Sequence, residues 1–330
     1  MTDLSTSYLG LMLKNPLVVS PSPLNEDLDN LRRMEDLGAS AVVLHSLFEE
    51  QINVQSNDLD RFLSHGAESF AEALSYFPEA QAYSLGPEGY LEHIRKAKKS
   101  VGIPIIGSLN GVSTGGWLGY AAQLAKAGAD AIELNIALLA SNFDHSAADI
   151  EGTYLKIVQA ICRQVKLPVA VKLGPYFTSL PQTALALRRA GASALVLFNR
   201  FYQLDFDIER LALTPGYHLS SPDEIHQSLR WIALLSADLG CDLCASTGVH
   251  DGAGVVKQLL AGAKAVQLCS ALFLKGMDRL GECLKDLEGW MKRHGFDKVE
   301  DFRGKMSREA SADPQLYERL QYIKVYVGLD

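Results

Sequence analysis

The chain has 330 residues, 48% of them hydrophobic and 21% charged, and its formal net charge is −8. A chain of this size can bury one barrel-sized core or two smaller ones. The acidic charge is spread without a basic run, which argues against nucleic acid as the main partner. No apolar run approaches the roughly 18 residues that cross a bilayer, and the first residues, MTDLSTS, lack the features of a signal peptide. We therefore expect a cytoplasmic protein that makes no membrane contact.

Four segments along the chain share one sequence pattern, in which a helical stretch ends at a glycine and an unbroken apolar run follows. The four glycines are Gly38, Gly128, Gly191 and Gly262. A residue without a Cβ can adopt the left-handed conformation that ends a helix. An unbroken apolar run is typical of a strand that is buried on both faces in a parallel sheet. The pattern therefore predicts a short connection from a helix to a parallel strand.

Eight apolar runs are predicted as strands, in chain order 15–20, 41–44, 103–108, 131–134, 167–173, 194–198, 241–246 and 265–268. Helical patterns follow them at 26–37, 88–100, 116–127, 149–165, 179–190, 222–238, 251–261 and 278–294. This alternation favours a (β/α)8 TIM barrel, formed by residues 1–330 as a single domain, over an open doubly wound sheet. Three long connections, 47–87, 136–148 and 199–221, are typical of loops that cover a site.

In such a barrel the chemistry lies at the carboxyl ends of the strands. The residues that follow the apolar runs are therefore the candidates for the site, and most of them are polar. They are Ser20, Pro21, Ser22, His45, Ser46, Ser108, Asn110, Asn135, Lys172, Asn199, Arg200, Ser246, Thr247, Gly248, Cys269 and Ser270.

Lys172 is the most unusual of these residues, because it ends the fifth predicted strand between apolar neighbours. Its ammonium group could stabilise negative charge on a cofactor, or its amine could form a Schiff base. A third interpretation is structural, with the lysine facing solvent or paired with a nearby carboxylate.

The loops after the last two strands predict a phosphorylated ligand. Gly248 lets backbone N–H groups approach an anion, and Ser270 lies at the start of a helix whose dipole favours negative charge. These two loops form the common phosphate site of such barrels. Asn135 and Asn199 each present a donor and an acceptor, which suits the edge of a heterocycle, although either amide could instead cap a loop.

No metal site is predicted. Cys241 and Cys244 form an isolated C-x-x-C within a predicted strand, and no second ligand pair follows. His45, His145 and His250 lie in or beside the loops of the site but have no metal-ligand spacing. The five cysteines do not suggest a disulfide framework or an iron–sulfur centre.

Several longer strings complete the pattern: YLGLMLKNPLVVSPS, YSLGPEGYLEHI, ADAIELN, VKLGPYF, GVHDGAGVVKQLLAGAKAVQLCSALF and VEDFRGK. With these strings most of the chain resembles the dihydroorotate dehydrogenase family of FMN-containing barrels, and it is most similar to the soluble class 1 members. The resemblance implies bound FMN, a homodimer and a step of pyrimidine biosynthesis.

The resemblance also implies roles for single residues around the flavin. Lys172 matches a lysine near the flavin N1 and C2 carbonyl, and Asn135 and Asn199 match amides between flavin and substrate. The other implied flavin contacts are Ser20, Pro21, Ser22, His45, Ser46, Ser108, Asn110 and Ser246, with Thr247, Gly248, Cys269 and Ser270 at the phosphate.

The substrate side departs from the family pattern. In the loop NIALLASN, Leu138 stands where the family has a Cys or Ser base, and Ala140 stands where it has a substrate-binding Asn. Tyr83 replaces another such Asn, His45 a lysine, and Arg200 a small polar residue. Because a leucine cannot accept a proton, the general base stays open. The candidates are Ser141, His145, Tyr83 and His45.

The expected function is that of an FMN-dependent oxidoreductase that transfers a hydride or electrons through flavin N5. The nominal reaction converts dihydroorotate to orotate, although Arg200 hints at another small anionic substrate or an acidic partner. The electron acceptor or redox partner is unknown. Two alternatives stay open: a flavin-bearing accessory subunit that relays electrons, and a Schiff-base lyase that uses Lys172.

Overall fold

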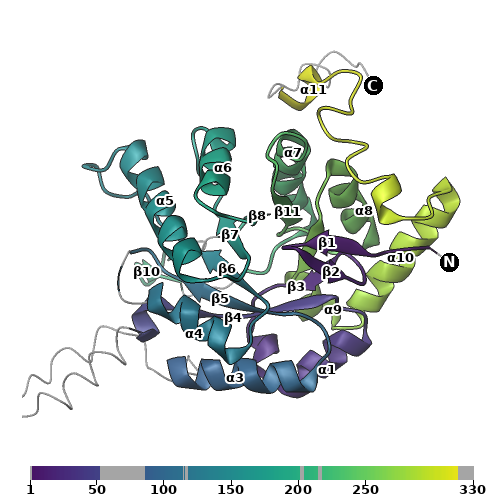
Figure 1. Ribbon diagram of the computed structural model, residues 1–330. Helices are drawn as coiled ribbons and strands as arrows, with labels where there is room; N and C mark the ends of the chain where they lie inside the picture. The colour runs from purple at the N-terminus through teal and green to yellow at the C-terminus, as the bar shows by residue number, and fades with distance from the viewer. Residues whose placement is uncertain are drawn as a thin grey trace, which may run out of the picture.

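A computed structural model of the chain describes residues 2–52, 86–113, 115, 118–200, 204–214 and 218–318. At its centre eight parallel strands form a closed barrel in the order β11-β12-β3-β4-β5-β6-β7-β8, with helices around it (Figure 1). The predicted (β/α)8 TIM barrel is therefore confirmed, and the open sheet is excluded. That residues 1–330 form one domain stays a prediction.

The eight barrel strands coincide with the eight predicted apolar runs. They are Leu17–Val19 (β3), Ala41–Phe48 (β4), Ile105–Asn110 (β5), Ala131–Asn135 (β6), Val169–Leu173 (β7), Ala194–Leu197 (β8), Asp242–Ala245 (β11) and Ala265–Leu268 (β12). Strand β4 is longer than its apolar run, because it continues to pair with β5 beyond a register shift between Val43 and Ser46.

The predicted helices are also found, with shifts of a few residues at their ends. They are Leu28–Asp36 (α1), Pro87–Ser100 (α3), Gly119–Ala127 (α4), Ala147–Gln164 (α5), Leu180–Arg189 (α6), Ile225–Leu235 (α7), Gly252–Ala261 (α8) and Arg279–His294 (α10). Short 3-10 turns precede α1 and α7, and each begins with a proline whose fixed φ suits a first turn. Those turns are Pro23–Glu26 (η1) and Pro222–Glu224 (η5). The described residues also include the short helical elements Ser270–Lys275 (α9), Val299–Asp301 (η6) and Gln315–Glu318 (α11).

The four glycines of this sequence pattern have the predicted left-handed conformation. Their φ angles are +105° at Gly38, +102° at Gly128, +116° at Gly191 and +115° at Gly262. L side chains rarely adopt such angles. At Gly262 a Cβ would also lie 2.4 Å from the Cβ of Ser236, so this connection lies close to the end of α7. Because each connection returns the chain to a parallel strand, all the carboxyl ends meet at one end of the barrel.

A hairpin that the patterns did not predict fills the other end. Strands Thr6–Tyr8 (β1) and Leu11–Leu13 (β2) pair in antiparallel fashion. Tyr8 is buried against alanines at the starts of the barrel strands, including Ala131 and Ala194. Because those side chains are small, the barrel interior has room for the tyrosine ring.

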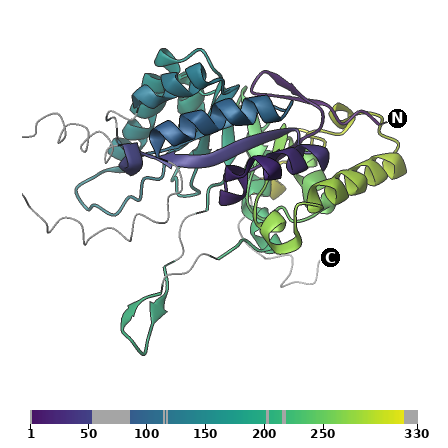
Figure 2. The same cartoon turned by 90° about the horizontal axis from the view of Figure 1, so that it is seen from below.

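The connection after β8 contains a second, smaller hairpin, formed by Phe206–Asp207 (β9) and Ala212–Leu213 (β10). Figure 2 shows it extending away from the body of the barrel. Within the described residues, no helix has the length and hydrophobicity that spanning a membrane requires.

Candidate active site

Two adjoining cavities lie at the carboxyl ends of the strands. The first has a volume of about 90 Å³ and is lined by Ser20, Lys172, Phe198, Asn199, Arg200, Ser220, Ser246, Thr247, Gly248, Val249, Gln267, Cys269 and Ser270. The second, of about 660 Å³, shares Phe198, Asn199, Arg200, Ser246 and Thr247 with the first. It continues toward Tyr176, Leu204 and the start of α7. Most of the residues predicted from strands β3, β7, β8, β11 and β12 therefore line one site.

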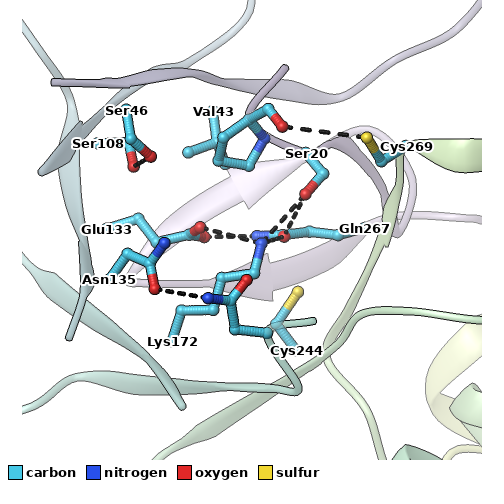
Figure 3. A network of polar contacts seen from close by, with 12 residues as sticks. Ser20, Val43, Ser46, Ser108, Glu133, Asn135, Lys172, Cys244, Gln267 and Cys269 are labelled. Atoms are coloured by element: carbon cyan, nitrogen blue, oxygen red, sulfur yellow. Dashed lines mark hydrogen bonds and ion pairs between the residues drawn. The ribbon is translucent and has the colours of Figure 1, made fainter. Parts of the chain in front are cut away.

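Lys172 lies at the centre of a buried polar network (Figure 3). Its Nζ donates to Gln267 Oε1 at 2.8 Å and to Ser20 Oγ at 3.1 Å, and lies 3.4 Å from Glu133 Oε1. The side chain faces the barrel interior and is only 5% exposed. The lysine thus both lines the cavity and pairs with a carboxylate, and its role toward a cofactor stays a prediction.

Glu133 and Gln267 are the functional candidates that the sequence reasoning missed. Both are buried, and Gln267 Nε2 donates to Glu133 Oε2. Within the described residues, the other carboxylate oxygen, Glu133 Oε1, accepts no hydrogen bond and lies 3.4 Å from Lys172 Nζ. A buried carboxylate is costly unless a cation compensates it. The sequence does contain a signal for both residues, because each is a charged or amide residue inside an otherwise apolar strand.

The amides of Asn135 and Asn199 meet at the edge of the cavity. Asn199 Nδ2 donates to Asn135 Oδ1 at 2.9 Å, which joins the loop after β8 to the end of β6. This bond leaves the Asn135 amide nitrogen and the Asn199 carbonyl oxygen for other partners. The structure brings the two predicted residues together, and their roles toward a ligand stay a prediction.

A tight turn at Thr247 and Gly248 and the start of the short helix α9 form the side of the cavity predicted for a phosphate. Thr247 and Gly248 both have positive φ, +74° and +77°, and Thr247 Oγ1 donates to the carbonyl of Phe198 at 3.0 Å. Ser270 begins α9, and its Oγ accepts a hydrogen bond from Ser220 N at 3.0 Å. Backbone N–H groups and hydroxyls therefore surround this corner, which suits an anion.

The remaining residues predicted to contact the flavin do not line either of the two cavities. Ser46 Oγ and Ser108 Oγ are 2.8 Å apart, and Figure 3 shows both on the Glu133 side of the barrel. Asn110 ends β5 beside Asn135. Ser22 precedes η1 and is buried, and the carbonyl of Pro21 lies 4.0 Å from Cys269 Sγ.

His45 is not brought to the cavity. Its ring packs edge-on against Tyr90 of α3, with centroids 4.9 Å apart, and lies 6.1 Å from the ring of His93. The register shift in β4 is the physical reason, because it turns Ser46 toward Ser108 of β5. Burial lowers the pKa of His45 to about 4; Glu26 opposes this shift and His93 adds to it. Among the residues that the structure describes, its buried Nδ1 has no hydrogen-bond partner.

This shift predicts an acid-dependent loss of stability. The unfolded chain binds the His45 proton below its usual pKa near 6.5, whereas the folded protein binds it only below about 4. The full contribution of neutral His45 to the free energy of unfolding is therefore present above pH 6.5. This contribution falls by up to about 3 kcal/mol as the pH is lowered toward 4. Urea unfolding at several pH values should show this dependence, and His45→Phe should lack it. His145→Phe, at an exposed position, should behave like the wild type; equal pH slopes in all three proteins would contradict the assignment.

The candidate general bases that the structure describes are not among the residues that line the two cavities. Ser141 and His145 are exposed in the loop between β6 and α5, and Leu138 packs partly against the core. Tyr83 lies outside the described residues. Arg200 lines both cavities, but its Nε donates to Glu224 Oε2 at 2.8 Å, so its charge is already paired. Among the described residues no group of three metal-ligating side chains forms a metal site.

Comparison with known proteins finds one matching family model and several similar proteins. The family model described as dihydroorotate dehydrogenase matches residues 3–291. The chain is 26% identical over 306 residues to a "Dihydroorotate dehydrogenase B (NAD(+)), catalytic subunit" of Thermoplasma acidophilum, covering 92% of this chain and 99% of that protein. It is 27% identical over 307 residues to a protein of the same name from Pyrococcus abyssi, covering 91% and 98%. A third, from Methanothermobacter thermautotrophicus, is 27% identical over 308 residues, covering 91% and 97%.

Proposed function

The chain belongs to the dihydroorotate dehydrogenase family, and from this premise we propose that it binds FMN at the barrel mouth and acts as a flavin-dependent oxidoreductase. The observation that carries the proposal is the buried ammonium of Lys172 beside a cavity whose other side is formed by hydroxyls and the tight backbone turn at Thr247 and Gly248. This donor set matches a ligand with a polar ring at one end and a phosphate at the other.

The chain's own residues divide into two groups around such a ligand. Ser246, Thr247, Gly248, Cys269 and Ser270 would hold the phosphate, and Ser20, Lys172, Asn135 and Asn199 would face the ring. When bound, FMN supplies two-electron chemistry by accepting a hydride at N5. Lys172 contributes a fixed positive charge that favours the arrival of electrons, and Glu133 offsets part of that charge.

Loading with FMN tests this proposal directly. The purified protein would be incubated with excess FMN and passed through a desalting column, and the retained flavin would be measured by its visible absorbance. We expect near-stoichiometric retention. A folded protein that retains no flavin would sink the proposal.

The substrate is proposed only as a class, namely a small anionic molecule of which dihydroorotate is the nominal example. We propose that Leu138 stands at the position of the family's general base, as the resemblance implies, and a leucine cannot remove a proton. General-base help is worth roughly 10² to 10⁴ in rate. We therefore propose that this chain oxidises dihydroorotate slowly, unless another group supplies the base.

Substitution of Leu138 tests the missing base. In the FMN-loaded protein, Leu138→Cys is expected to raise the rate of anaerobic flavin reduction by dihydroorotate by about tenfold or more. Stopped-flow absorbance would measure this rate. Leu139→Cys is the matched control, because Leu139 is the next residue and is 73% exposed. If both variants react at the wild-type rate, the pocket differs from that of its relatives by more than its base.

A second candidate is a flavin-bearing subunit that relays electrons without an organic substrate of its own. One observation favours it: no acid or base of the expected loop, residues 136–148, lines either of the two cavities. A flavin that dihydroorotate never reduces, but that dithionite reduces and an added acceptor reoxidises, would decide for this candidate.

The Schiff-base lyase is disfavoured by the surroundings of Lys172. Its Nζ contacts Ser20, Gln267 and Glu133, an arrangement that stabilises a charged ammonium. A nucleophilic lysine needs an uncharged amine.

A further inference from the structure

His250 is a buried titratable residue close to the proposed phosphate site. It lies between β11 and α8 and is not among the residues that line the two cavities. Its backbone carbonyl accepts a hydrogen bond from Arg279 Nε at 2.8 Å, which fixes the loop. Its Nε2 lies 3.1 Å from the Oγ of Ser220, and Ser220 does line the first cavity. The ring therefore reaches the cavity through one hydroxyl group.

The contacts of Ser220 place this hydroxyl in the corner predicted for an anion. Its backbone N–H donates to Ser270 Oγ at 3.0 Å, and both serines line the first cavity together with the turn at Thr247 and Gly248. We call Ser220, Thr247, Gly248 and Ser270 the anion corner. Accepting from a backbone N–H leaves the Ser270 hydroxyl its own proton for a ligand. The proton of the Ser220 hydroxyl is different, because the imidazole of His250 competes for it.

The protonation state of His250 decides what the Ser220 hydroxyl offers to an anion. A hydroxyl has a single proton to donate. A neutral imidazole can accept that proton at Nε2, and the oxygen lone pairs that then remain would repel an anion. A protonated imidazole carries a proton on both nitrogens, so it only donates. Ser220 Oγ then accepts from Nε2, and its own proton is available to bind an anion.

We propose that His250 regulates the anion corner, so that its protonation strengthens the binding of a phosphorylated ligand through the Ser220 hydroxyl. The inference rests on the proposed function, because it takes FMN as that ligand. His250 is a positioning residue, since it acts through Ser220 and needs no contact with the phosphate. Its positive charge adds a favourable interaction with the dianion.

The charged groups around His250 keep its ring mostly neutral near pH 7. Burial and the positive charge of Lys275 lower the pKa of His250, whereas Asp251, the backbone carbonyl of Ser220 and Glu224 oppose this shift. A bound dianion favours the charged ring and raises the pKa again. Binding therefore takes up a proton, and the affinity must rise as the pH falls.

The affinity for FMN, measured between about pH 8 and about pH 5.5, tests the inference. The Kd of the wild type is compared with that of His250→Gln, whose amide can still donate to Ser220 but does not titrate. We expect the wild type to gain about tenfold over this variant as the pH falls, because a neighbouring opposite charge shifts a pKa by about one unit or more. Protonation of the FMN phosphate itself is common to both proteins and cancels in this ratio. Riboflavin, which lacks the phosphate, should show no such gain.

Two further variants separate this regulation from a loss of folding. Ser220→Ala removes the hydroxyl but keeps the backbone N–H that donates to Ser270 Oγ, and it should lose most of the gain at low pH. His294→Gln is the matched control and should behave like the wild type, because His294 is exposed at the end of α10 and lines neither cavity. Urea unfolding checks that each variant is folded at every pH used.

The pKa of His250 gives a second readout that does not need a flavin. Proton NMR would follow the His250 ring resonance, assigned by its absence in His250→Gln, with and without sulfate, which stays doubly charged over this pH range. We expect sulfate to raise the pKa of His250. This result in a protein that retains no FMN would support the regulation and reject only the proposed function. Stoichiometric FMN with the same pH dependence in the wild type and His250→Gln would overturn the inference, as would a pKa that sulfate leaves unchanged.

Discussion

Replacing Lys172 with methionine is expected to destabilise the fold and to weaken the binding of FMN. The substitution keeps much of the apolar stem but leaves the buried carboxylate of Glu133 without the cation that lies 3.4 Å from it. Breaking a buried ion pair in this way costs about 3–5 kcal/mol. Urea unfolding of the flavin-free protein measures this cost, and visible absorbance after desalting measures the retained FMN.

The flavin reduction potential gives a second, independent readout of the same charge. In the FMN-loaded protein, Lys172→Met should lower the potential, by about 30 mV for each 1.4 kcal/mol of lost charge stabilisation. Glu133→Gln should shift it in the opposite direction, because it leaves the Lys172 charge uncompensated. The double variant Lys172→Met/Glu133→Gln should recover most of the stability but not the potential. Unchanged flavin content and potential in Lys172→Met would count against the role assigned to the lysine.

Gly248→Ala is expected to have a comparably large effect on the opposite side of the cavity. A Cβ at this position would lie 2.1 Å from Ile225 N and 2.6 Å from the carbonyl carbon of Glu224. Both are backbone atoms at the start of α7, so a rotamer change cannot relieve the clash. The φ of +77° adds the strain of a left-handed alanine. Together these effects should cost about 2–5 kcal/mol and displace the turn proposed to hold the phosphate.

Two glycine controls separate the causes of this loss. Gly295→Ala has a similar φ, +71°, with no atom within 4 Å of the added Cβ, so it carries the backbone strain alone. Gly119→Ala, near the start of α4, meets neither strain nor contact and should be close to neutral. Thermal unfolding and FMN retention would be measured for all three variants. If Gly248→Ala retains FMN as well as Gly295→Ala does, the turn does not form the phosphate site.

Local sequence patterns were sufficient to predict the barrel and several of the residues that line its cavity. Apolar runs ended by polar residues gave the positions of Ser20, Lys172, Asn199 and Ser270, and the barrel brings all four to one cavity. This follows because parallel strands place their carboxyl ends at the same edge whatever the details of packing. His45 also follows its apolar run but is not among the residues that line the two cavities, because a register shift within β4 adds one residue to that strand.

The partners of the predicted residues required the tertiary structure. Glu133 and Lys172 are 39 positions apart in the sequence, and Gln267 lies on a strand further along the barrel. Their contact depends on which side chains face inward at the same level of the closed barrel. No local pattern contains this information, because each strand shows its own polar residue but not which residue of another strand faces it.

The order of strands and helices, and the end of the barrel that carries the site, thus follow from the amino-acid sequence, because hydrophobic periodicity and helix-ending glycines act over a few residues. Only the folded chain decides that the Lys172 charge is shared with Glu133 and that Arg200 is paired with Glu224. These features arise from the closure of the barrel, which sets distances between residues that are remote along the chain.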